Sequence, residues 1–97
     1  MKILALEKEL PGTDPQGFQA HSKAEALRAW ELVQAGTLRE IYFRADRNEA
    51  VLVLECRDAA EAQDVLASLP LVKAGLIAFD VIPLAPYPGF AHLFETE

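Results

Sequence analysis

Apolar and polar residues recur along this chain with two different periods, and each change of period marks a boundary between expected elements. Four short apolar segments, some alternating strictly with polar residues, predict β-strands. Two longer segments repeat their apolar residues every three or four positions, which predicts α-helices. The expected order is a strand at 2–7, a helix at 18–35, strands at 38–45 and 50–56, a helix from 58 to 69, and a strand at 76–84.

Residues that favour caps and turns separate these segments. Proline and glycine make 10–17 a loop, and Gly36 is placed to end the long helix in a left-handed conformation. The polar run 46–49 predicts a hairpin turn between the two central strands. The second helix is expected to begin at the capping pair Asp58 and Glu61 and to end at Pro70. Residues 71–75 are expected to form a connection after it.

The same periods assign faces to the elements. In the second strand one side holds Ile41, Phe43 and Ala45, and the other holds Leu38, Glu40, Tyr42 and Arg44. In the third strand we expect the side that faces the helices to hold Leu52, Leu54 and Cys56, with Cys56 as a small core hydrophobe. The long helix repeats its apolar residues at Ala26, Leu27, Trp30 and Val33, which predicts that Trp30 is a core residue.

The order βαββαβ predicts an α+β fold of the ferredoxin-like kind, a four-stranded antiparallel sheet with two helices on one face. We expect one domain over residues 1–97. The other sheet face carries apolar side chains, namely Tyr42, Val51, Val53, Ala78 and Ile82. A second copy of the chain should therefore cover this face and form a dimeric α/β barrel. The tail 86–97 is also apolar, and we expect it to pack on a neighbouring subunit; His92 in it has no evident partner.

Composition narrows the kinds of partner. The net charge is −6 and no basic cluster is present, which argues against nucleic acid and against a basic membrane-surface helix. Hydrophobic residues make up 52% of the chain, more than one small core needs, which favours a homodimer or a higher homo-oligomer. One cysteine and the lack of a readable signal or membrane segment predict a cytoplasmic protein. No residues show metal-ligand spacing, so we expect no metal.

The sheet face away from the helices carries the first candidate chemistry. Glu40 and Asp80 could act as general base or acid, because a carboxylate in an apolar cavity has a raised pKa. Tyr42 or Arg44 could bind the substrate and stabilise an enolate. The alternative is that Glu40 and Arg44 form an ion pair across the sheet or at a dimer interface. His21, near the start of the long helix, could move a proton or bind substrate, or be a surface histidine.

Residues 22–88 resemble the muconolactone isomerase family. Three features carry the resemblance: the run Leu32-Val33-Gln34-Ala35-Gly36-Thr37-Leu38-Arg39, a charged hairpin, and Leu66-Ala67-Ser68-Leu69-Pro70-Leu71 before a last strand that ends near Leu84 and Pro88. The resemblance implies a dimeric ferredoxin-like barrel, assembly into rings, and a role in the breakdown of aromatic compounds. It also implies proton transfer between carbons of an unsaturated lactone, without a cofactor. Glu25 matches the family's carboxylate on the first helix, and Arg39 matches its retained arginine.

The chain departs from the family pattern at several positions. Glu40 stands where the family commonly has histidine, 72–75 lack the family's aromatic residues, and Pro86 and Tyr87 replace a basic residue and a histidine. Two kinds of function therefore stay open. One is an isomerase acting on an unsaturated lactone or cyclic acid, with cofactor-independent monooxygenation as a variant by analogy of fold. The other is a non-catalytic oligomeric module for binding or structure.

Overall fold

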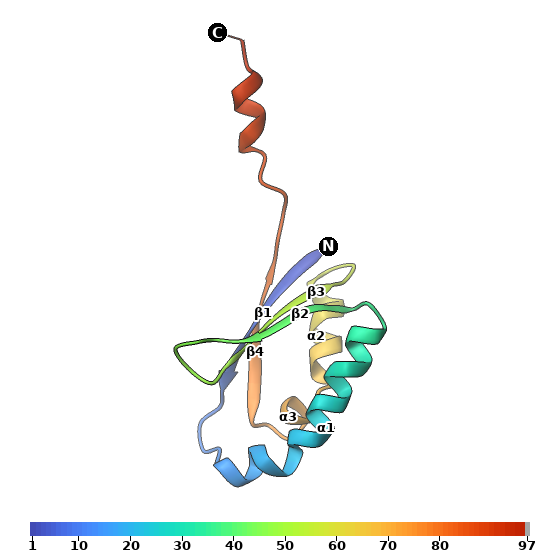
Figure 1. Cartoon of the computed structure of the whole chain (residues 1–97), viewed down its shortest axis with the longest axis vertical. Coiled ribbons are helices and arrows are strands. Elements are labelled where there is room, and N and C mark those ends of the chain that lie inside the picture. The colour runs from blue at the N-terminus through green and yellow to red at the C-terminus, as the bar shows by residue number, and fades with distance from the viewer. Residues whose placement is uncertain (97) are drawn as a thin grey trace.

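A computed structural model describes residues 1–96 of the chain (Figure 1). It contains four strands, three α-helices and a short 3-10 helix. Their bounds are β1 (Lys2–Glu9), α1 (Pro15–Gln34), β2 (Leu38–Phe43), β3 (Ala50–Glu55), α2 (Ala59–Ala67), α3 (Pro70–Lys73), β4 (Ile77–Pro83) and η1 (Gly89–Phe94).

The four strands form one antiparallel sheet in the order β2-β3-β1-β4. The helices α1, α2 and α3 all lie on one side of this sheet (Figure 1). This arrangement confirms the predicted ferredoxin-like fold. The dimeric barrel stays a prediction, since the structure holds a single chain.

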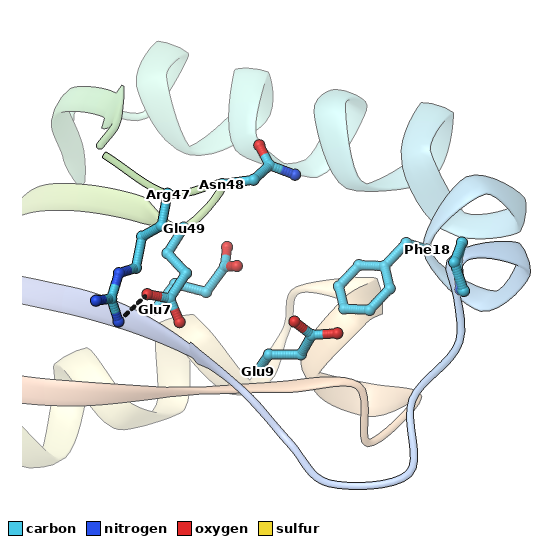
Figure 2. A pocket seen from close by; sticks show the side chains of 7 residues that line it. Glu7, Glu9, Phe18, Arg47, Asn48 and Glu49 are labelled. Atoms are coloured by element: carbon cyan, nitrogen blue, oxygen red, sulfur yellow. Dashed lines mark ion pairs between the residues drawn. The ribbon is translucent and has the colours of Figure 1, made fainter. Parts of the chain in front are cut away.

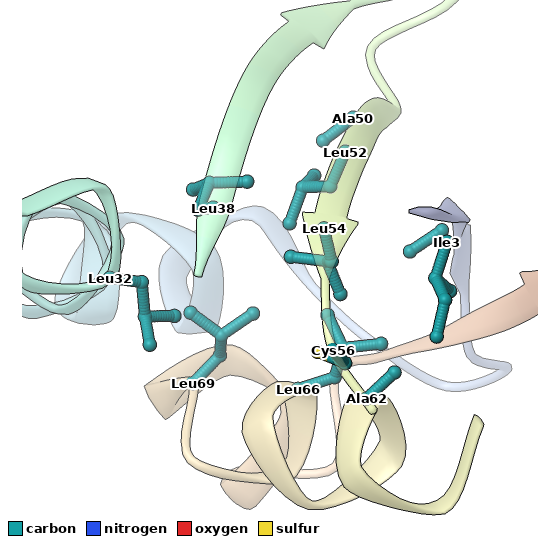
Figure 3. Packing of buried hydrophobic residues seen from close by; sticks show 11 residues of the cluster. Ile3, Leu32, Leu38, Ala50, Leu52, Leu54, Cys56, Ala62, Leu66 and Leu69 are labelled. Atoms are coloured by element: carbon teal, nitrogen blue, oxygen red, sulfur yellow. The ribbon is translucent and has the colours of Figure 1, made fainter. Parts of the chain in front are cut away.

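The core lies between the sheet and the helices, where Ile3, Leu54, Leu66 and Leu69 pack together (Figure 3). Ile3 and Leu54 are partners on adjacent strands, so their side chains point to the same face. Burying an aliphatic side chain of this size contributes about 1.5–3 kcal/mol relative to leaving it exposed. Cys56 is buried in the same cluster, as predicted from its position.

Helix α1 begins earlier than the sequence pattern indicates. The side chain of Asp14 accepts a hydrogen bond from the Gly17 N–H at 2.8 Å, and Pro15 occupies the first helical turn. A fixed proline φ suits that position, because the N–H that proline lacks would have no partner there. The proline-rich segment predicted as a loop therefore contributes the first turn of the helix. A second correction concerns 71–75, whose first residues belong to helix α3 and not to an irregular connection.

Strand β2 departs from simple alternation near its start. Its register with β3 shifts between Leu38 and Glu40, so Arg39 forms a bulge. Because of this extra residue, Leu38 lies on the helix side and is 1% exposed. The prediction that Leu38 shares a face with Glu40 and Tyr42 was wrong for this reason.

The apolar stripe predicted on α1 points outward. Trp30 is 57% exposed, and Leu27 is also exposed. The residues that face the sheet are instead Glu25, Ala29 and Leu32, spaced by four and three. The prediction that Trp30 is a core residue was wrong. The polar residue Glu25 occupies one of the inward positions, so the inward face of α1 cannot be recognised from apolar residues alone.

The segment after β4 leaves the body of the domain and ends in η1 (Figure 1). It gives the described chain a length of 62 Å against widths of 29 and 21 Å. Its aromatic side chains are exposed, with Phe94 at 83%. His92 does have a partner, contrary to expectation, because its Nδ1 lies 2.6 Å from Oε1 of Glu95. Packing of this tail on a neighbouring subunit stays a prediction.

Candidate functional site

A cavity of about 430 Å³ lies between α1 and the helix side of the sheet. Its walls are mostly apolar, from α1, the sheet, and the segment around Leu69 and Leu71. Four polar side chains interrupt these walls: Glu7, Ser22, Glu25 and Asn48. A small number of polar groups in an apolar hollow of this size is typical of sites for small molecules.

The cavity exists because small residues stand where larger ones would fill the space. Ala26 and Ala29 face it from α1, and Ala50 faces it from β3. On the β2 side, Phe43 points to the helix side of the sheet but is 69% exposed. Most of this phenyl ring is therefore uncovered by residues 1–96, and the cavity is open beside it.

Two carboxylates enter the cavity from different elements. Glu7 follows Ile3 and Ala5 on the helix side of β1, and Glu25 lies on α1. Both side chains are half-buried. Burial raises the pKa of Glu7, and the negative charges of Glu49, Glu25 and Glu9 raise it further, while the Ala50 N–H has the opposite effect.

Glu25 also connects two helices. Its Oε1 accepts a hydrogen bond at 2.9 Å from the Leu71 N–H, which lies in the first turn of α3. Burial raises the pKa of Glu25, although this hydrogen bond and the nearby His21 lower it in part. The result is a carboxylate that is held in one orientation and binds a proton more readily than usual.

A second hollow of about 570 Å³ adjoins the first at the hairpin end of the sheet (Figure 2). Glu7, Phe18 and Glu49 line it, together with Glu9 and Arg47. Arg47 Nη1 lies 3.6 Å from Oε1 of Glu49, so its charge is paired. Glu7 lines both hollows and has no ion-pair partner within residues 1–96.

The structure separates the predicted site residues into two groups. Glu40 and Tyr42 lie on the sheet face away from the helices, opposite Val53 and Val51. The Tyr42 hydroxyl donates a hydrogen bond to Glu40 at 2.9 Å, which raises the pKa of Tyr42. Asp80 shares this face and accepts from Lys8 Nζ at 2.8 Å.

The two predicted arginines are engaged locally. Arg44 donates to both carboxylate oxygens of Asp46, at 2.9 and 2.7 Å. Within the chain Arg44 therefore pairs with the acids of the turn and not with Glu40 across the sheet. An ion pair of Arg44 with Glu40 at a dimer interface stays a prediction. Arg39 donates through Nε to the Gly36 carbonyl beside the bulge.

On the helix side, His21 and Glu25 lie one helical turn apart on α1, so the structure brings these two predicted residues together. Sequence reasoning missed Glu7. The signal was available, because extending the alternation of Ile3 and Ala5 by one step puts Glu7 on the same face. Among residues 1–96, no group of three His, Cys, Asp or Glu residues is placed to hold a metal ion. No helix in that range is long and apolar enough to cross a membrane.

The fold and the cavity together define a class: a small ferredoxin-like domain with carboxylates in an apolar hollow between its long helix and its sheet. The family model described as muconolactone delta-isomerase matches residues 5–89. No curated protein matches the chain. Because the family model covers most of the sequence, the chain belongs to the muconolactone delta-isomerase family.

Solved structures agree in fold. A crystal structure of muconolactone isomerase is 23% identical, with a TM-score of 0.74 over 91% of this chain and 92% of that one. The 5-chloro-2-hydroxyhydroquinone dehydrochlorinase of Burkholderia phenoliruptrix, in complex with 2,5-dihydroxybenzoquinone, is 20% identical. Its TM-score is 0.68 over 88% of this chain and 94% of that one. At these identities the likeness establishes the shared fold.

Proposed function

We propose that this protein is a cofactor-independent isomerase that moves a proton between carbons of a small unsaturated lactone or cyclic acid. One observation carries the proposal: Glu7 and Glu25 enter one apolar cavity, and burial raises the pKa of both. Family membership supports the reaction class. A carboxylate whose pKa is raised toward the working pH is suited to take and return a proton.

In the proposed reaction, ionised Glu25 takes a proton from the carbon next to the carbonyl. The electron pair of that C–H bond passes into the conjugated system and makes a dienolate. Glu7, whose raised pKa favours the protonated form, can then donate a hydrogen bond to the enolate oxygen or give its proton to the far carbon of the dienolate. Return of a proton at a different carbon shifts the double bond, and no oxidant or reductant is consumed. His21, one turn from Glu25, is proposed to pass protons between Glu25 and water.

The sheet face away from the helices offers a second candidate site. In a dimeric barrel, Glu40 and Asp80 would face a cavity between two subunits, with Tyr42, Arg44 and Arg39 as substrate-binding groups. In the single chain, however, Glu40 is hydrogen-bonded to Tyr42 and Asp80 is paired with Lys8. Glu7, by contrast, has no ion-pair partner within the described chain. We therefore favour the cavity beside α1.

The paired acids on that face favour the alternative function, an oligomeric binding or structural module without catalysis. Asp80 with Lys8 and Glu55 with the Met1 amino group are both ion pairs. Glu7 counts against that alternative, because its carboxylate lines two hollows and has no ion-pair partner within the described chain. A purely structural domain gains nothing from desolvating such a group. Cofactor-independent monooxygenation has no particular observation in its favour.

The test compares two pairs of variants. Exchange of deuterium from D₂O into unsaturated γ-lactones, followed by proton NMR, reports proton abstraction even before a product is known. We expect Glu25→Gln and Glu7→Gln to slow exchange by about 10²-fold or more. Glu40→Gln and Asp80→Asn should exchange at close to the wild-type rate. If the second pair loses exchange and the first keeps it, the site lies on the other face; if wild type exchanges no lactone in the panel, the isomerase proposal fails.

A further inference from the structure

Asn48 stands at the hairpin end of the cavity beside α1, and the proposed reaction gives it no role. It lines both the cavity and the adjoining hollow. Asn48, Ala50 and Leu52 are spaced by two and all line the cavity, so Asn48 continues the helix side of β3 into the turn. Figure 2 shows its side-chain amide pointing away from Arg47 and Glu49, its neighbours in the turn.

The hairpin turn does not explain this asparagine. Asparagine is common in turns because its side chain can bond to the nearby backbone and because it tolerates a left-handed conformation. Among residues 1–96, only glycines have a positive φ. The turn is closed by other groups, because the Arg44 N–H donates to the Glu49 carbonyl at 2.9 Å and the Arg44 guanidinium donates to Asp46. The hydrogen bonds within the described chain include none from the Asn48 amide, so its donors are available to a ligand.

Other hydrogen-bond donors in the cavity wall are already engaged. The Ser22 hydroxyl donates to a backbone carbonyl of its own helix at 3.0 Å, and the Leu71 N–H donates to Glu25 at 2.9 Å. Apart from a protonated Glu7, the side-chain donor left for a carbonyl oxygen in this cavity is therefore the amide of Asn48.

The cationic groups near the cavity also have partners. His21 lies close enough to Glu25 to lower the pKa of that carboxyl, and in the proposed reaction it moves protons there. Arg47 lines the adjoining hollow and not the cavity, and it lies 3.6 Å from Glu49. A fixed cation in the place of Asn48 would lower the pKa of the cavity carboxyls and hold them ionised. An amide donates hydrogen bonds without that effect.

From this placement we infer that Asn48 is a catalytic residue, whose amide N–H donates a hydrogen bond to the carbonyl oxygen of a ring substrate and to the enolate oxygen formed from it. The inference rests on the proposed function and separates the two roles left open there for Glu7. Asn48 binds the oxygen, and Glu7 gives its proton to the far carbon of the dienolate. The substrate then lies between Glu25 on α1 and Asn48 on the hairpin, with Glu7 on β1 beside the carbon that receives the proton.

The charge that develops in the reaction explains why a donor is needed. When Glu25 takes the proton, the electron pair of the C–H bond passes into the substrate, and the negative charge moves from the carboxylate to the substrate oxygen. An oxygen with this charge is costly to hold in a mostly apolar hollow without a hydrogen bond. Removing one donor from such a site typically slows a reaction by about 10²–10³-fold. Afterwards Glu25 loses its proton to water through His21 and Glu7 regains one from water, so protons and electrons balance.

The first test measures exchange of deuterium from D₂O into unsaturated γ-lactones in Asn48→Ala and Asn48→Asp. We expect both variants to slow exchange by about 10²-fold or more, because neither alanine nor an ionised aspartate of the same shape has a donor. The matched control is Gln63→Ala, which removes an exposed amide on α2 that lines neither hollow. This control should exchange at the wild-type rate. Circular dichroism checks that each variant is folded, and Asn48→Asp serves alone if Asn48→Ala does not fold.

The second test compares the binding of two ligands by titration calorimetry of the full chain at one pH and salt concentration. Tetronic acid is a five-membered lactone whose stable enolate resembles the proposed intermediate, and a saturated γ-lactone has an uncharged carbonyl group. We expect Asn48→Ala to weaken binding of the tetronate by about tenfold or more and binding of the saturated lactone by about threefold or less. A purely structural change would weaken both alike.

The inference is overturned, and the proposed function stands, if Asn48→Ala exchanges deuterium at the wild-type rate while Glu25→Gln does not. It is also overturned if Asn48→Ala weakens both ligands equally, if wild type does not bind tetronate, or if Gln63→Ala behaves like Asn48→Ala. If wild type exchanges no lactone, the proposed function fails and the inference fails with it. Slow exchange together with selective loss of tetronate binding supports the role of Asn48.

Discussion

Removal of the Glu25 side chain tests whether this residue holds α1 against α3 in addition to its proposed chemical role. In Glu25→Ala, the Leu71 N–H loses its acceptor at 2.9 Å. A hydrogen bond to a charged group contributes about 1.5–3 kcal/mol. Glu25 is only half-buried, so water can replace part of this bond, and we expect a loss of about 1–2 kcal/mol. In a domain of this size each kcal/mol lowers Tm by about 4–8 °C.

Glu25→Gln should behave differently from Glu25→Ala. The amide oxygen of glutamine can still accept from Leu71, and the variant no longer has a charge to desolvate. We expect its stability to stay within about 0.5 kcal/mol of wild type, while proton abstraction falls. The two variants together would separate the structural role of Glu25 from its chemical role.

The measurement is urea and thermal unfolding followed by circular dichroism, at one protein concentration because association would shift Tm. Glu31→Ala and Glu31→Gln are the matched controls on the same helix. Glu31 is exposed and pairs with Arg28 at 3.4 Å, a contact worth about 0.5 kcal/mol or less. Equal stability of Glu25→Ala and Glu31→Ala would refute the role assigned to the bond with Leu71. Equal losses in Glu25→Ala and Glu25→Gln would show that the charge, and not the hydrogen bond, is what matters.

Three further predictions concern the other parts of the fold. The pKa of Glu7 is raised above 4.5 in the folded state, so the folded state binds a proton more tightly than the unfolded state does, and stability falls as pH rises past that value. In urea unfolding, Glu7→Gln should therefore have the stability of wild type near pH 4 and a higher stability than wild type at pH 7. Gly36 has φ +79°, so Gly36→Ala should lower the free energy of unfolding by about 1–2 kcal/mol and Gly36→Asn by less. Equal losses would contradict the role of Gly36 as the left-handed residue that ends α1. Val53→Lys on the open sheet face should turn a sedimenting dimer into a monomer while Asp64→Lys does not; a monomeric wild type at micromolar concentration would refute the barrel.

The order of elements could be predicted because it depends on local signals. Each strand is bounded by prolines, glycines or polar turns, and the Asp58 side chain accepts from the Glu61 N–H at 2.8 Å as expected. The face of each residue was less predictable, since it depends on register. One bulge residue, Arg39, moves Leu38 into the core, and nothing in the residue types near it indicates the shift.

The site was harder to predict than the fold because a candidate acid in a sequence does not reveal its side of the sheet. The sequence indicates Glu40 and Asp80 because they are polar residues in apolar strands, but both have partners on the open face. In the sequence Glu7 resembles the charged end of a strand, whereas β1 continues to Glu9. Its half-buried position depends on α1, which no property of residues 2–9 specifies.

One orientation of α1 explains why Leu27 and Trp30 point outward while Glu25 points inward. Helix α1 is fixed at its C-terminal end by Leu32 in the core, and at its middle by the bond of Glu25 to Leu71. With these two points set, the period of the helix fixes every other side chain, and it places alanines over the sheet. Small residues there leave the hollow open and put the carboxylates of Glu7 and Glu25 at its wall. The exposure of Trp30 and the open hollow that the proposed chemistry needs therefore depend on the same orientation of α1.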